Sequence, residues 1–186
     1  MPADPRLNRA AHILRSGGVI GYPTEAVYGL GCLPLNTDAI LRLIGLKGRS
    51  ARKGLILIAA DIAQIDPFVD LSQSAVIDRI HASWPGPQTW VLPAKPLVPA
   101  LLTGGRDTLA VRITAHPVAG ALCARVGSAI VSTSANLSGH PPARSALALR
   151  RRLGRKIDYV LAGRLGGNLR PTSIRDGRSG ALLRPG

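Results

Sequence analysis

The chain has 186 residues, of which 46% are hydrophobic and 3% are aromatic, and its formal net charge is +14. This length allows one domain with a sizeable core, and the low aromatic content makes that core aliphatic. The scarcity of aromatic side chains argues against continuous stacking platforms for single-stranded nucleic acid. Arginine supplies 20 of the 24 basic residues, which favours forked contacts to phosphate or carboxylate groups. We therefore predict a single domain, residues 1–186.

The basic residues are unevenly distributed along the chain. Residues 125–186 hold 12 basic side chains, and Asp158 and Asp176 are the only acidic residues there. Such an excess of positive charge indicates a polyanionic partner such as RNA, or an anionic small substrate.

Cysteine usage and hydropathy limit the class of protein further. Cys32 and Cys123 are isolated in the sequence and indicate neither a zinc site nor a disulfide framework. The amino-terminal segment has no apolar signal core, and no apolar run approaches about 18 residues. We therefore predict no membrane span and a soluble cytoplasmic protein.

Capping residues and hydrophobic spacing predict the elements of the first half of the chain. Asp4-Pro5 is typical of a helix start, and Leu7, Ala10 and Leu14 follow on one helical face. Asn36 precedes a second helix, and the apolar run 55–58 is the clearest central strand. The other predicted elements are strands at 19–22 and 26–30, a short helix from residue 61 and a helix at 71–84.

The second half of the chain is richer in strands. Strands are predicted at 89–92, 109–113, 129–131 and 159–161, helices at 117–126 and 145–153, and a hairpin at 172–175 and 181–184. Asp176-Gly177 supplies the turn-forming pair of that hairpin. Since strands and helices do not alternate strictly and the hairpin requires antiparallel pairing, we predict an α/β fold with a mixed, twisted open sheet flanked by helices.

The stretch Val131–Gly139 changes character abruptly. The apolar run 129–131 gives way to a cluster of hydroxyl side chains and Asn136, and a Gly/Pro turn follows. Polar groups at a strand end often lie at the ligand-binding edge of an α/β sheet, and neutral donors can bind an anion. Ser, Thr and Asn also favour turns and caps, so the stretch alone is compatible with either a site or a structural turn.

A cluster of cations follows the second predicted helix. Lys47, Arg49, Arg52 and Lys53 lie close together in the sequence, and the glycines among them leave room for a ligand near the backbone. One interpretation is a phosphate clamp. The other is a solvated basic turn at a helix C-terminus, where a cation is favourable by about 0.3–1 kcal/mol.

Three further polar residues stand among apolar ones. Thr24 and Glu25, the only glutamate in the chain, follow a predicted strand directly after Pro23. They are placed either to orient a small polar ligand or to form a structural turn. Arg112 lies inside the run 109–113, so its charge must face solvent, a cleft or a partner.

Segment 144–156 carries six basic residues, namely Arg144, Arg150, Arg151, Arg152, Arg155 and Lys156. They form either a solvated helix face or a footprint for an RNA backbone. The sequence contains no P-loop, no GxGxxG fingerprint and no GxSxG nucleophile elbow. A nucleotide must therefore be held by another architecture.

Five motifs occur in order along the chain. They are the segments 22–31 (Tyr-Pro-Thr-Glu-Ala-Val-Tyr-Gly-Leu-Gly), 47–49 (Lys-Gly-Arg), 53–56 (Lys-Gly-Leu-Ile), 109–112 (Leu-Ala-Val-Arg) and 132–139 (Ser-Thr-Ser-Ala-Asn-Leu-Ser-Gly). Together they resemble the YrdC-like family, most closely its short bacterial members, over residues 7–184. The resemblance implies a single YrdC-like domain with a large, basic concave cavity.

The resemblance also implies a nucleotidyltransferase. Members of this family combine L-threonine, bicarbonate or carbon dioxide, and ATP into threonylcarbamoyl-adenylate, with release of pyrophosphate. The product supplies the threonylcarbamoyladenosine modification of tRNA, which implies downstream threonylcarbamoyl-transferase proteins as partners. Mg²⁺ is expected with ATP, held through phosphates and water rather than by a protein cage.

The resemblance assigns the ATP site to two motifs. Lys47 and Arg49 match its Lys-x-Arg signature and are expected to hold the phosphates and offset charge during the reaction. Ser132, Ser134 and Asn136 match its Ser-x-Asn signature and are expected to bind the nucleotide from the opposite wall of a cleft. Catalysis would come mostly from positioning.

Other residues receive roles from the same resemblance. Thr24 and Arg112 match threonine-binding positions, and Arg112 suits the threonine carboxylate. The further expected ATP-binding residues are Lys53, Thr108, Arg144 and Ser173.

Two departures from the family pattern and one alternative function accompany these expectations. Many members have Lys-Pro-Leu where this chain has Lys53-Gly54-Leu55, which makes that loop freer. Longer relatives carry a second C-terminal domain that does not follow Gly186, so we expect its lid function to be absent or supplied by a partner. The alternative is a non-catalytic protein that binds double-stranded RNA or tRNA, or a ribosome-maturation factor.

Overall fold

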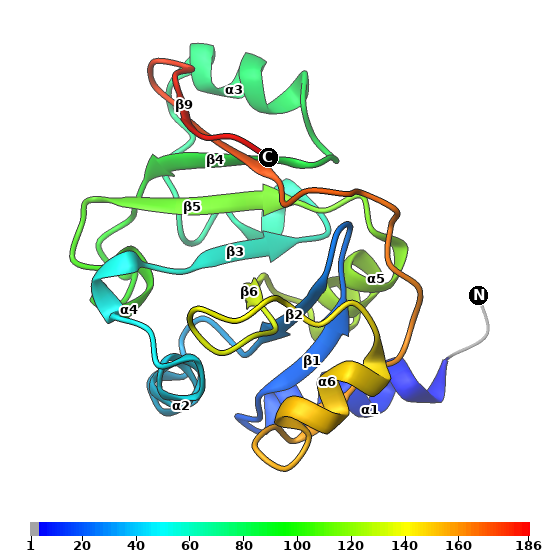
Figure 1. The fold of residues 1–186 in the computed structure, drawn as a ribbon. Coiled ribbons are helices and arrows are strands. Elements are labelled where there is room, and N and C mark those ends of the chain that lie inside the picture. The colour runs from blue at the N-terminus through cyan, green and yellow to red at the C-terminus, as the bar shows by residue number, and fades with distance from the viewer. Residues whose placement is uncertain (1–3) are drawn as a thin grey trace.

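The computed structural model describes residues 4–186, which form one nine-stranded sheet with flanking helices (Figure 1). The strand order is β7-β1-β2-β6-β3-β5-β4-β8-β9. The strands are β1 (Ile20–Pro23), β2 (Tyr28–Gly31), β3 (Ile56–Ala59), β4 (Gln88–Pro93), β5 (Thr108–Ile113), β6 (Ile130–Ser134), β7 (Tyr159–Val160), β8 (Ser173–Asp176) and β9 (Leu182–Arg184). Parallel and antiparallel pairs alternate irregularly, so the predicted mixed sheet is confirmed. Figure 1 shows β1 and β2 rotated relative to β3–β5, as expected of a twisted sheet.

Helices begin at the capping residues that the sequence provides. The α-helices are α1 (Pro5–Arg15), α2 (Thr37–Lys47), α3 (Ser74–His81), α4 (Ala100–Thr103), α5 (Pro117–Val126) and α6 (Ala146–Leu153), and the 3-10 helices are η1 (Ala51–Lys53) and η2 (Ile62–Gln64). The side chains of Asp4 and Asn36 accept from backbone N–H groups at the starts of α1 and α2. Within residues 4–186, no helix is long and apolar enough to cross a membrane.

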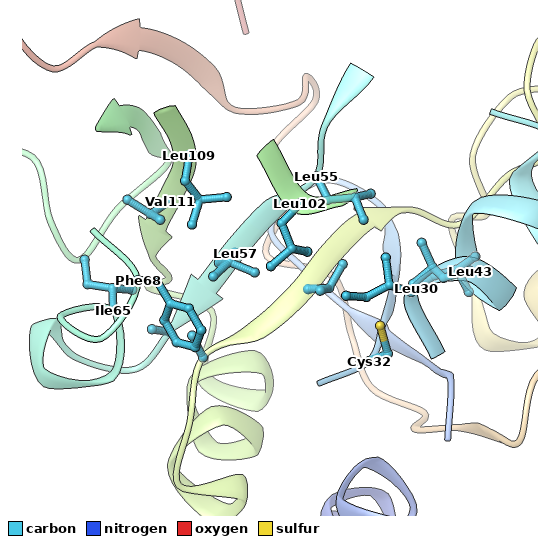
Figure 2. Packing of buried hydrophobic residues seen from close by; sticks show 14 of the residues in the cluster. Leu30, Cys32, Leu43, Leu55, Leu57, Ile65, Phe68, Leu102, Leu109 and Val111 are labelled. Atoms are coloured by element: carbon cyan, nitrogen blue, oxygen red, sulfur yellow. The ribbon is translucent and has the colours of Figure 1, made fainter. Parts of the chain in front are cut away.

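Successive residues of the central strand β3 face two different cores. Leu57 belongs to the larger core, which also contains Leu43 of α2 and Val111 of β5 (Figure 2). Ile58 packs on the opposite face with Leu122 of α5, beneath α1 and α5. This alternation is the period of two of a β-strand, and it leaves both faces of the central sheet apolar.

Among residues 4–186, no helix covers one part of the sheet face that carries α1 and α5. Ile56, on the same face as Ile58, lies opposite Ser132 of β6 and Ala110 of β5. Ala110 lies opposite Val91 of β4, and Val91 lies opposite Asp176 of β8. These residues form one row across five strands, and all of them line the same cavity.

Most predicted elements are present, with shifted ends. The strand predicted at 129–131 continues to Ser134, because Ser132 pairs with Ile56 and Ser134 pairs with Gly29 of β2. The helix predicted at 71–84 is wrong in length, since α3 begins at residue 74 and ends at residue 81. The short helices α4 and η1 were not predicted. The extension of β6 into the polar stretch therefore results from backbone pairing with β2 and β3 rather than from hydrophobic side chains.

Leu57 is 0% exposed at the centre of the sheet, whereas Leu97 is 70% exposed. We expect Leu57→Ala to lower the free energy of unfolding by about 2–5 kcal/mol, because it removes transfer free energy and leaves a cavity. Leu97→Ala is the matched control and should change it by less than about 0.5 kcal/mol. Urea denaturation measures both, and equal small losses would contradict the central place of Leu57.

Candidate active site

A cavity of about 660 Å³ lies over the uncovered part of the sheet. Pockets of this size hold small-molecule ligands and cofactors. The row of five residues described above forms its floor. Its rim comes from segments that are distant in the sequence, namely 24–29, 53–55, 102–106, 171–172 and 183–184.

Cationic side chains dominate the charge of this cavity. The charged lining residues are Arg49, Lys53, Arg106, Arg112 and Arg184, against the carboxylates Glu25 and Asp176. Burial and then the neighbouring Arg184 lower the pKa of Arg49, and burial and then Arg112 lower the pKa of Arg184. Because the guanidinium group is not deprotonated in proteins, both side chains stay charged at neutral pH. The cavity is therefore suited to an anionic ligand.

Arg112 and Glu25 form a buried ion pair in the cavity lining. Arg112 Nη2 lies 3.1 Å from Glu25 Oε2, and the side chains are 7% and 8% exposed. Thr114 Oγ1 donates to Glu25 Oε1 at 2.6 Å. Among the described residues, Arg112 Nε has no hydrogen-bond partner. A buried guanidinium with an unused donor is a favourable place for a ligand carboxylate.

A glycine-containing segment crosses the loop that carries Glu25. Gly166 N donates to the Thr24 carbonyl at 3.1 Å, and Asn168 N donates to the Glu25 carbonyl at 2.9 Å. A Cβ on Gly166 would lie 2.9 Å from Glu25 Cα, so this close crossing requires glycine. Thr24 Oγ1 donates to the Val27 carbonyl at 2.7 Å. The loop is thus both a structural turn and part of the cavity wall.

The Lys-x-Arg and Ser-x-Asn motifs contact each other directly. Lys47 Nζ donates to the Ser134 carbonyl and, at 3.0 Å each, to the carbonyl and side-chain oxygens of Asn136. Lys47 is 4% exposed and does not line the cavity. The prediction that these motifs face each other across a cleft is therefore wrong, because the end of α2 and the loop after β6 form one wall.

Arg49 is the member of the Lys-x-Arg pair that lines the cavity. Its Nη2 donates to the Gly54 carbonyl at 2.9 Å, and its Nη1 lies 3.4 Å from Thr133 Oγ1. Gly54 has a φ of +64°, which the fixed negative φ of proline cannot reach. Its backbone also approaches Leu102 closely, with Leu55 N donating to the Leu102 carbonyl at 2.7 Å. Hydrogen bonds to Gly54 and Leu55 therefore fix this loop, as a proline ring would do in other family members.

The structure brings together most of the residues predicted for the site. Those that line the cavity are Thr24, Arg49, Lys53, Thr108, Arg112, Ser132 and Ser134. Those that lie outside the lining are Lys47, Asn136, Arg144 and Ser173. Arg144 is exposed. Ser173 alternates with the lining residues of β8 and points the other way, where its Oγ donates to Gln88 Oε1 at 2.7 Å.

Two cations of the cavity, Arg106 and Arg184, were not predicted from the sequence. Arg106 precedes β5, and Arg184 lies in the edge strand β9. Arg184 carries the same signal that singled out Arg112, a cation in an apolar strand. Arg106 stands in a Gly/Asp-containing loop, and no local pattern distinguishes it from a surface arginine.

The sequence also matches a family model over nearly its whole length. The Sua5_yciO_yrdC model, described as telomere recombination, matches residues 12–186. The chain belongs to the Sua5/YciO/YrdC family. Within the family, the threonylcarbamoyl-AMP synthase of Halorhodospira halophila is 59% identical over 179 residues, which cover 96% of this chain and 94% of that protein. The threonylcarbamoyl-AMP synthase of Methylococcus capsulatus is 55% identical over 96% of each chain. The resemblance drawn from the motifs is confirmed.

Solved structures of Sua5/YciO/YrdC proteins share this fold. P. abyssi Sua5 complexed with L-threonine has a TM-score of 0.91 and 35% identity over 97% of this chain, which spans 54% of the Sua5 chain. E. coli YciO has a TM-score of 0.86 and 27% identity over 100% of this chain and 91% of its own. The predicted fold class, an open mixed sheet flanked by helices, is therefore confirmed.

Glu25→Gln tests the buried ion pair of this site. The variant leaves Arg112 as an uncompensated buried charge, so we expect the free energy of unfolding to fall by about 3–5 kcal/mol. Asp66→Asn is the control, because Asp66 pairs with Lys95 at 3.5 Å on the exposed surface and such pairs contribute little. Thermal or urea denaturation distinguishes them, and a Glu25→Gln variant as stable as Asp66→Asn would contradict the pairing.

Proposed function

We propose that this protein is a threonylcarbamoyl-AMP synthase, which forms L-threonylcarbamoyladenylate and pyrophosphate from L-threonine, bicarbonate or carbon dioxide, and ATP. The names of relatives with 59% and 55% identity support this assignment. The observation that carries it is the cavity of about 660 Å³. One region of its lining contains the buried Arg112–Glu25 pair, and the rest of the lining contains the further cations Arg49, Lys53, Arg106 and Arg184. An amino acid and a triphosphate can both be accommodated by those two regions.

The proposed reaction has two bond-forming steps. The threonine amine attacks the carbon of carbon dioxide and loses a proton, which gives a carbamate. A carbamate oxygen then attacks the α-phosphorus of ATP, the bond from that phosphorus to the bridging oxygen breaks, and pyrophosphate leaves. Little covalent chemistry is asked of the protein, so positioning and charge stabilisation carry the rate.

Threonine is assigned to the region around Arg112 and Thr24. Arg112 Nη2 lies 3.1 Å from Glu25 Oε2, which holds the guanidinium in place. Among the described residues, Arg112 Nε has no hydrogen-bond partner and can donate to a ligand. A forked contact from this side chain to the threonine carboxylate fixes the amine relative to ATP. The complex of P. abyssi Sua5 with L-threonine supports a threonine site in this fold.

The ATP phosphates are assigned to Arg49 and Lys53, with the hydroxyl of Thr108 as a neutral donor. The positive charges of Arg49 and Lys53 offset the negative charge that accumulates on the departing pyrophosphate. Within residues 4–186, no group of three or more His, Cys, Asp or Glu side chains is placed to hold a metal ion. We expect Mg²⁺ that accompanies ATP to be ligated by phosphate oxygens and water, and no step above depends on a metal held by the protein.

Mass spectrometry of the purified protein tests this function. Wild type should form threonylcarbamoyl-adenylate and release pyrophosphate only when threonine, bicarbonate and ATP are all present. Arg49→Ala should lower the rate by about 10²–10³-fold, because it removes a preorganised charge at the phosphates. Arg52→Ala, on the same turn but outside the cavity lining, is the matched control and should be nearly as active as wild type. If wild type forms no adenylate from the three substrates, the assignment fails.

A second candidate activity is RNA binding, which the exposed arginines of α6 and its C-terminal turn favour. Arg150, Arg151, Arg152, Arg155 and Lys156 are all exposed, and the net charge is +14. Binding of tRNA by this surface, handover of the adenylate to a threonylcarbamoyl-transferase and a cytoplasmic location belong to the same proposal.

The salt dependence of tRNA binding tests this surface. Replacing Arg150 and Arg151 together by alanine should weaken binding and reduce the slope of log affinity against log salt by about 1–2, because fewer counterions are released. Arg178→Ala is the control, since it lies in the β8–β9 turn at the other edge of the sheet. An unchanged slope in the double variant would exclude this surface.

A further inference from the structure

We propose that Lys47 is a positioning residue, which fixes the wall formed by Ser132–Asn136, and that it is not a ligand of the ATP phosphates. The inference deepens the proposed function and rests on it for the identity of the ligand. It divides the Lys-x-Arg motif into two roles, with Arg49 directed to the cavity and Lys47 directed into the protein.

The hydrogen bonds of the Lys47 ammonium leave no donor for a phosphate. An ammonium group has three N–H donors and no acceptor. In this structure four oxygens lie within hydrogen-bond distance of them, namely the Ser134 carbonyl, the Asn136 carbonyl, Asn136 Oδ1 and, at 3.5 Å, Ser134 Oγ. A phosphate contact would require Lys47 to give up at least one of these bonds while the group remains 4% exposed.

The loop after β6 depends on Lys47 through backbone contacts as well. Ser138 N donates to the Lys47 carbonyl at 2.8 Å. Asn136 Oδ1 accepts from Ser134 Oγ at 2.7 Å, and Asn136 Nδ2 donates to the Leu137 and His140 carbonyls at 3.0 and 2.6 Å. The polar groups of this loop are therefore used to fold it around the Lys47 ammonium. Ser134 is left on the cavity side of that arrangement.

The position of Lys47 in α2 explains why a cation is tolerated there. It is the last residue of α2, where the unpaired carbonyl groups of the helix favour positive charge. Burial and then Arg49 lower the pKa of Lys47 to about 8. The amine therefore remains predominantly protonated at pH 7 and keeps all three donors.

The two roles can be separated with Lys47→Met and Lys53→Met. Both replacements remove one charge from an unbranched side chain, but only Lys53 lines the cavity. In the ligand-free protein, Lys47→Met should raise hydrogen exchange of the 136–140 amides by about tenfold or more, because charged hydrogen bonds to the loop are lost. Lys53→Met should leave this exchange unchanged.

ATP affinity measured against salt gives the second readout. Direct contact between a cation and a phosphate makes binding weaken more steeply with salt. Lys53→Met should therefore flatten the salt dependence, whereas Lys47→Met should weaken ATP binding and keep the wild-type slope. A flattened slope in Lys47→Met with unchanged loop exchange would overturn the proposal.

Amine modification of the wild-type protein keeps the test valid if Lys47→Met does not fold. With acetic anhydride at neutral pH, Lys47 should be unreactive with or without ATP, and Lys53 should react and be protected by ATP. Reaction of Lys47 that ATP suppresses would overturn the proposal. If the protein binds no ATP, the proposed function fails, while loop exchange and the reactivity of ligand-free Lys47 still test its position.

Discussion

The buried ammonium of Lys47 is the contact that joins the two halves of the candidate ATP site. Lys47 is the last residue of α2, and its ammonium group donates to Ser134 and Asn136, which lie 87 and 89 positions further along the chain. A cation with 4% exposure must have its donors matched, since an unpaired buried charge is strongly unfavourable. The loop after β6 therefore has to fold around it. Arg49, two residues later, and Ser134 both line the cavity on this wall.

A second buried charge fixes the other region of the cavity. Arg112 is held by Glu25, and Glu25 is held by Thr114 and by the segment that contains Asn168. Both regions are thus organised before any ligand arrives, which is the condition for catalysis by positioning. Between them, the row of five residues from β6 to β8 forms a floor that is neutral apart from Asp176.

Local signals in the sequence were sufficient for most of the fold and for part of the site. The caps at Asp4 and Asn36 and the apolar run of β3 depend on neighbouring residues and were predicted correctly. The length of β6 was not, because it depends on pairing with β2 and β3. Likewise, a motif shows that Lys47 and Asn136 belong together, but whether they face a ligand or each other is decided by tertiary contacts. A local pattern marks Arg184 as a cation in a predicted strand, but its position at the cavity depends on the register of the β8–β9 hairpin.

A crystal structure with a non-hydrolysable ATP analogue and L-threonine would test the proposed roles of Arg49, Arg112 and Lys47 together. We expect the phosphates on Arg49 and Lys53, the threonine carboxylate on Arg112, and Lys47 Nζ still bound to the oxygens of Ser134 and Asn136. An analogue bound outside this cavity would contradict the proposed ATP site. Phosphates bound to Lys47 Nζ, with Asn136 displaced, would contradict the positioning role of Lys47.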